Sequence, residues 1–151
     1  GGMPAPLAGW RALLALCALA GALDAPRYTF PTYASAVATL EALAKTHPHL
    51  LRLTTAQAAY GLPSAGVCRY GGARGSAPCE NHVVHVTNRR TLPDRDRPEI
   101  LVLGGLHGDE RIGQVASIEL IRFLVETHAR GAAAGAAGAW VRRLVDGVNL
   151  Y

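Results

Sequence analysis

The chain has 151 residues, half of them hydrophobic and 17% charged, which is typical of one globular domain with a packed core. The formal net charge is +4. The cations are scattered, for example Arg89-Arg90, Arg95, Arg97 and Arg142-Arg143. Because they form no basic stripe interleaved with aromatic residues, we expect them on a solvated surface and exclude a nucleic-acid-binding protein.

Residues 1–25 predict a secretory signal peptide. After a leading Gly-Gly, Met3 begins a segment with one cation, Arg11, an apolar run at residues 12–20, and small residues up to Ala25. The alternative is a single membrane anchor, but the run is shorter than the roughly 20 residues that cross a bilayer. We expect cleavage at one of several small-residue sites, no stable membrane anchor, and a secreted or lumenal domain at residues 26–151.

Two cysteines remain after Cys17 leaves with the signal peptide. Cys68 and Cys79 bracket a loop whose glycines would let its ends meet. An oxidising compartment favours a disulfide bond between them, whereas a reducing cytosol would leave two free thiols. The predicted export favours the disulfide.

The periodicity of apolar residues predicts alternating helices and strands. Helices are expected at residues 33–47, with Thr32 as N-cap, at 113–128 and at 139–145. Strands are expected at residues 50–55, 82–88, 100–103 and 148–151. A turn at 60–63, a charged loop at 89–98 and a flexible low-complexity loop at 131–138 connect them. This order predicts an α/β fold, a mixed sheet with helices on both faces.

The most informative segment is residues 100–113, where an apolar run ends in Gly104-Gly105 and is followed by His107 and Glu110. The run, preceded by Pro98, predicts a buried strand, and ligands collect at the carboxyl edge of such sheets. Imidazole nitrogen and carboxylate oxygen are both zinc ligands, and a spacing of three lets one turn of backbone direct them at one ion. Alternatively, His107 hydrogen-bonds locally and Glu110 caps the next helix.

The other histidines are poorer candidates. His128 falls near the end of a predicted helix and suits a cation at a helix C-terminus. His82 and His85 are an odd number of residues apart on a strand and face opposite sides. His47 and His49 flank a proline and are expected on a surface turn.

The sequence GGLHGDERIG, after ILVL and before a helix, resembles the first zinc-binding motif of the M14 metallocarboxypeptidases. Residues 33–51 resemble the opening helix and first turn of that family, and residues 139–151 resemble its helix and strand before an Asn-Pro-Asp-Gly segment. The resemblance covers about residues 28–151 and the first half of the family's domain. It implies a carboxypeptidase-like α/β/α sandwich, incomplete in this chain.

The resemblance also implies a chemistry. His107 and Glu110 would be the first two ligands of Zn²⁺, and the substrates would be the C-termini of peptides or proteins. The third histidine ligand, the Asn-Arg pair and tyrosine that hold the substrate, and the glutamate general base lie further along in the family. We therefore expect a fragment with no catalytic residue of its own, inactive alone. The alternatives are a secreted non-catalytic binding module or pseudo-peptidase, and a zinc deacylase of N-acyl amino acids.

Overall fold

The structure is a computed structural model that describes residues 29–64, 66–69, 76–107 and 109–151. The predicted signal peptide at residues 1–25 lies outside the described residues. Within the described ranges, no helix has the length and apolar character needed to cross a membrane.

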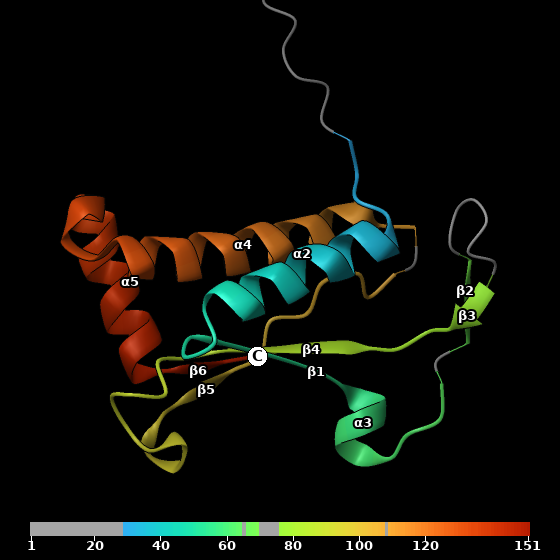
Figure 1. The fold of residues 1–151 in the computed structure, drawn as a ribbon, viewed down its shortest axis with the longest axis horizontal. Coiled ribbons are helices and arrows are strands. Elements are labelled where there is room, and N and C mark those ends of the chain that lie inside the picture. The colour runs from blue at the N-terminus through green and yellow to red at the C-terminus, as the bar shows by residue number, and fades with distance from the viewer. Residues whose placement is uncertain (1–28, 65, 70–75, 108) are drawn as a thin grey trace, which may run out of the picture.

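Helices and strands alternate along the chain (Figure 1). The helices are α2 (Tyr33–Thr46), α3 (Ala56–Tyr60), α4 (Arg111–Arg130) and α5 (Gly135–Gly147), with 3-10 turns η2 (Asp94–Asp96) and η3 (Gly131–Ala134). The strands are β1 (Leu51–Thr55), β2 (Val67–Arg69), β3 (Ser76–Pro78), β4 (His82–Val86), β5 (Glu99–Ile100) and β6 (Asn149–Leu150). The three predicted helices and four predicted strands are therefore all present, with changed bounds.

Four strands form a mixed sheet in the order β1-β4-β6-β5. Strand β4 runs antiparallel to both β1 and β6, while β5 runs parallel to β6. Val86 pairs with Leu51 on one side and with Leu150 on the other, so these three buried side chains lie in one row across the sheet. The mixed α/β class predicted from the sequence is confirmed.

Helices α2 and α4 pack against each other over one face of the sheet (Figure 1). Helix α5 runs from the C-terminal end of α4 back toward the sheet. The core lies between these helices and the row of buried strand residues. It consists of Leu43, Leu50, Leu51, Val86, Leu124, Val125, Val141, Val145 and Leu150. In the part of the chain that is described, both long helices cover the same face, so the structure does not show the predicted sandwich with helices on both faces.

Helix α2 begins where the sequence predicts. The Thr32 hydroxyl accepts a hydrogen bond from the Ser35 N–H at 3.2 Å, a cap that contributes about 1 kcal/mol. Leu40 and Leu43, three residues apart, are buried on the face toward the sheet. Local capping and helical periodicity agree here, which is why this helix was predictable.

The disulfide between Cys68 and Cys79 is present, as predicted. It joins the hairpin of β2 and β3, with a Cα–Cα distance of 5.0 Å. Cys79 also donates its backbone N–H to the carbonyl of Gly66 at 2.8 Å. The bond therefore closes the base of the loop that the two cysteines bracket.

The predicted flexible loop at residues 131–138 is wrong. These residues form η3 and the first turn of α5. Their alanines have the highest intrinsic helix propensity, which the low-complexity pattern obscured. At Gly138 a Cβ would come within 2.5 Å of the Gly131 carbonyl oxygen, so glycine allows this close turn between α4 and α5.

The prediction of a buried strand at residues 100–103 is also wrong in its burial. Leu101 is 67% exposed and Leu103 70%, while Ile100 and Val102 are each 42% exposed. Strand β5 itself ends at Ile100, although the backbone beyond it stays hydrogen-bonded to the chain after β6, since Val102 donates to the Tyr151 carbonyl at 2.7 Å. Among the described residues, however, β5 pairs only with β6, so it forms an edge of the sheet and its apolar side chains stay accessible.

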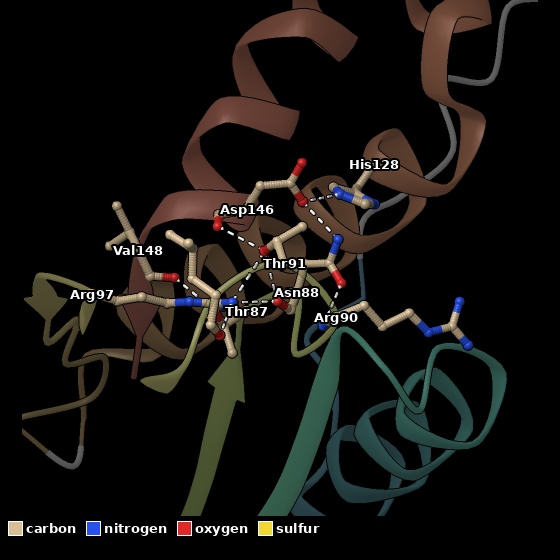
Figure 2. Close-up of polar contacts among 9 residues, drawn as sticks. Thr87, Asn88, Arg90, Thr91, Arg97, His128, Asp146 and Val148 are labelled. Carbon is tan, nitrogen blue, oxygen red and sulfur yellow. Dashed lines mark hydrogen bonds and ion pairs between the residues drawn. The ribbon is translucent and has the colours of Figure 1, made fainter. Parts of the chain in front are cut away.

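Arg97 is 5% exposed, which corrects the expectation that it lies on a solvated surface. Figure 2 shows its guanidinium among the residues that follow β4. It donates to the hydroxyl of Thr87, to the carbonyl of Asn88 at 2.6 Å, to the Thr91 hydroxyl at 3.0 Å and to the Leu92 carbonyl at 2.6 Å. The partners are neutral oxygens, so the guanidinium holds the loop in place without a carboxylate.

The same network reaches α4 and α5 (Figure 2). The Asp146 carboxylate accepts from the Asn88 amide at 2.8 Å and lies 2.8 Å from the His128 Nε2. Asp146 also accepts at its backbone carbonyl from the Thr91 hydroxyl at 2.9 Å. The ends of both helices are thereby tied to the loop that leads into β5.

Arg97→Met is expected to lower the free energy of unfolding by on the order of 2–4 kcal/mol, because it leaves buried carbonyl and hydroxyl acceptors without their donor. The matched control is Arg95→Met, since the Arg95 side chain is 86% exposed. That variant should stay within about 0.5 kcal/mol of the wild type. Urea unfolding followed by circular dichroism measures both, and equal losses would contradict the role given to Arg97.

Candidate metal centre

The loop between β5 and α4 presents the two predicted ligands. Gly105 has a φ of 75°, a left-handed conformation that glycine adopts without strain, and the chain turns there away from the sheet. The Glu110 N–H then donates to the His107 carbonyl at 3.2 Å, and α4 begins at Arg111. His107 and Glu110 thus stand at the two ends of one tight turn.

The side chains of His107 and Glu110 converge. The His107 Nδ1 lies 3.1 Å from the Glu110 Oε2, and the side chains are 66% and 63% exposed. Glu110 is the N-cap residue of α4, yet its carboxylate makes no capping hydrogen bond. Glu110 thus occupies the N-cap position but forms no capping hydrogen bond, and its carboxylate is instead the local partner of the His107 imidazole.

The donor pair fits zinc. Zinc bonds to imidazole nitrogen at about 2.0–2.1 Å and to carboxylate oxygen at about 2.0–2.2 Å. Two such donors 3.1 Å apart would subtend about 95° at a shared ion, an angle open enough for further ligands. Without an ion, 3.1 Å also suits a hydrogen bond between the two groups. The distance is therefore compatible with a shared ion as well as with a direct hydrogen bond.

No third metal-binding side chain joins the pair within the described ranges, where no group of three His, Cys, Asp or Glu residues has a metal-binding arrangement. Asp109, between the two ligands, is exposed. A catalytic zinc ion is held by three protein ligands, and the predicted pair would account for two of them.

The other histidines have partners elsewhere. The His82 Nδ1 lies 3.3 Å from the Tyr33 hydroxyl, whereas His85 stacks on Tyr151 at 4.5 Å between ring centroids. These two histidines therefore face opposite sides of β4, as predicted. His128 lies in the last turn of α4 as predicted, but its closest acidic partner, Asp146, was missed because eighteen residues and a turn of chain separate them.

One protein family matches part of the chain. The sequence model of the zinc carboxypeptidase family, Peptidase_M14, matches residues 79–151, a stretch that contains the turn with both predicted ligands. Over these residues, somewhat less than half of the chain, the sequence is similar to the M14 zinc carboxypeptidase family. The match begins after β3, so it does not include the earlier segment that also resembles the family. No curated protein matches the chain significantly.

A cationic cluster lies at the far end of α4, away from the turn. Burial lowers the pKa of the His49 imidazole below the ordinary 6.5, and nearby positive charge lowers it further. The charges that contribute are, in decreasing order, those of Arg90, His128, His47 and Arg89. The folded chain therefore resists protonation of His49 more than the unfolded chain does.

His49→Gln is expected to make the chain less sensitive to acid. Because the folded-state pKa is lowered, the stabilisation from neutral His49 is present above pH 6.5 and is lost as the pH falls through that lowered pKa. His49→Gln has no imidazole at this position, so this loss of stability at acid pH does not occur in the variant. The urea midpoint should thus fall less between pH 7.5 and pH 5 in His49→Gln than in the wild type.

Arg90→Gln is the companion variant. It keeps His49 and removes the charged side chain that lowers the pKa of His49 the most. Its acid sensitivity should lie between those of the wild type and His49→Gln. An identical fall of the midpoint in all three proteins would contradict this account of the cluster.

Proposed function

We propose that His107 and Glu110 bind Zn²⁺ and that the chain supplies this part of the metal centre of a carboxypeptidase that hydrolyses C-terminal peptide bonds. The observation that carries the proposal is the 3.1 Å approach of the imidazole nitrogen and the carboxylate oxygen, in a segment that matches the zinc carboxypeptidase family. The proximity of two zinc-type donors and the similarity to this family both favour zinc as the metal.

The residues of the turn have defined roles in this proposal. Zinc, when bound, acts as a Lewis acid on the scissile carbonyl and on a water molecule. His107 supplies a neutral nitrogen ligand, and Glu110 supplies negative charge that offsets the charge of the dication. The exposure of both side chains leaves the ion accessible to the C-terminus of a peptide. The general base and the groups that hold the substrate's carboxylate would come from elsewhere.

We also propose that the protein works in a secreted or lumenal compartment. The disulfide between Cys68 and Cys79 supports an oxidising environment. A signal peptide at residues 1–25 would provide the route.

A non-catalytic secreted binding module is the second candidate. The described residues provide two metal ligands where a catalytic site uses three, and this favours a chain that binds metal or peptide without turnover. The carboxypeptidase and the binding module would both use His107 and Glu110 to bind metal, and they would differ in whether they hydrolyse peptides.

His107→Ala and Glu110→Gln are each expected to weaken zinc binding by about tenfold or more, since loss even of groups that only support a ligand costs 10–100-fold. Glu119→Gln is the matched control, because Glu119 is a half-exposed carboxylate on α4 that pairs with Arg122. Competition with a chromophoric chelator measures the affinities. Equal affinity of all four proteins would contradict the metal centre.

The zinc-loaded chain alone is expected to show no carboxypeptidase turnover, because the described residues offer only two predicted ligands and no positioned general base. Release of C-terminal residues from acylated dipeptides and from longer peptides, followed by mass spectrometry, measures this. Robust turnover that disappears in Glu110→Gln would overturn the proposal that the site is incomplete.

A further inference from the structure

The segment that connects β5 to the proposed metal-binding turn packs directly on the first turns of α4. A Cβ at Gly104 would lie 2.5 Å from the Gly113 carbonyl oxygen and 2.5 Å from the Ser117 hydroxyl oxygen. Both distances are shorter than real Cβ contacts. Only glycine at position 104 therefore allows the backbone of this segment to touch the backbone of the helix.

The contact is tight from the side of the helix as well. A Cβ at Gly113 would lie 3.0 Å from the Gly105 nitrogen and 3.4 Å from the Gly104 Cα. The Ser117 hydroxyl donates to the Gly113 carbonyl at 2.9 Å, which fixes the oxygen that faces Gly104. The two glycines thus form a backbone-to-backbone contact between the segment after β5 and helix α4.

The glycine contact joins the two ends of the segment that contains both ligands. Gly104 lies three residues before His107, and Gly113 lies three residues after Glu110. When the two ends of such a short segment are held together, the turn inside it has few conformations left. The glycine contact therefore limits how far the imidazole and the carboxylate can move apart.

We infer that Gly104 and Gly113 are positioning residues for the zinc ligands: their backbone contact holds His107 and Glu110 at the separation that a shared ion requires. This inference rests on the proposed function and adds to it residues that do not themselves touch the ion. It also explains why a sheet-edge loop, two-thirds exposed at both ligands, keeps them 3.1 Å apart.

Three Gly→Ala variants test the inference because they add the same methyl group in different surroundings. Gly104→Ala meets a backbone carbonyl at 2.5 Å, Gly113→Ala meets backbone atoms at 3.0–3.6 Å, and Gly147→Ala meets nothing within 4 Å. Zinc affinity and the visible spectrum of the cobalt(II)-substituted chain are measured for each, at a temperature where circular dichroism shows the variant folded.

Zinc affinity should fall by about tenfold or more in Gly104→Ala and by less in Gly113→Ala, as for other groups that orient ligands. Gly147→Ala should stay within about twofold. The cobalt spectrum should change in the same order. Because alanine favours helix more than glycine does, a purely structural role predicts that Gly113→Ala keeps the affinity and raises the urea midpoint. Unchanged zinc affinity and an unchanged cobalt spectrum in both Gly104→Ala and Gly113→Ala would overturn the inference. If Gly104→Ala does not fold, the result for Gly113→Ala is sufficient to test it.

A metal-free measurement separates this inference from the proposed function. In the wild-type chain, Glu110→Gln should shift the NMR signals of the His107 ring nitrogens, because the two groups are in contact. The same substitution should shift them less in the Gly113→Ala background and equally in the Gly147→Ala background. If zinc does not bind the wild type, the proposed function fails, and this NMR comparison still decides the inference: equal shifts in all three backgrounds would overturn it.

Discussion

The contact between the His107 imidazole and the Glu110 carboxylate is the interaction on which the functional account depends. A sheet edge, a left-handed glycine and a helix start combine to place two metal-type donors 3.1 Å apart in solvent. The Glu110 carboxylate makes no capping hydrogen bond and faces the His107 imidazole instead. Residues 79–151 match the zinc carboxypeptidase family, and this similarity is the reason for proposing zinc as the metal.

The rest of the described chain holds the frame around this turn. The core under α2 and α4 fixes the helix layer on one face of the sheet, and the network around Arg97 fixes the loop that enters β5. Since the chain runs from β5 to the turn proposed to bind zinc, the buried guanidinium lies before this segment and the glycine contact closes it. A polar network at one end and backbone packing at the other together keep an exposed loop in place.

Much of this fold could be predicted from the sequence because the signals are local. The Thr32 cap, the spacing of Leu40 and Leu43, and the glycines after the apolar run each act within a few residues. The failures have non-local causes. The exposure of Leu101 depends on which strands pair with β5, and the burial of Arg97 depends on oxygens from a loop that hydrophobic periodicity cannot locate. The closeness of Gly104 to Gly113 likewise appears only when the helix is packed.

A crystal structure of the chain soaked with zinc, with anomalous diffraction recorded at the zinc edge, tests the central claim most directly. The account predicts an anomalous peak about 2.0–2.2 Å from both the His107 Nδ1 and the Glu110 Oε2, with Gly104 and Gly113 still in contact. Zinc bound only at other sites, with His107 and Glu110 hydrogen-bonded to each other and no density between them, would contradict it.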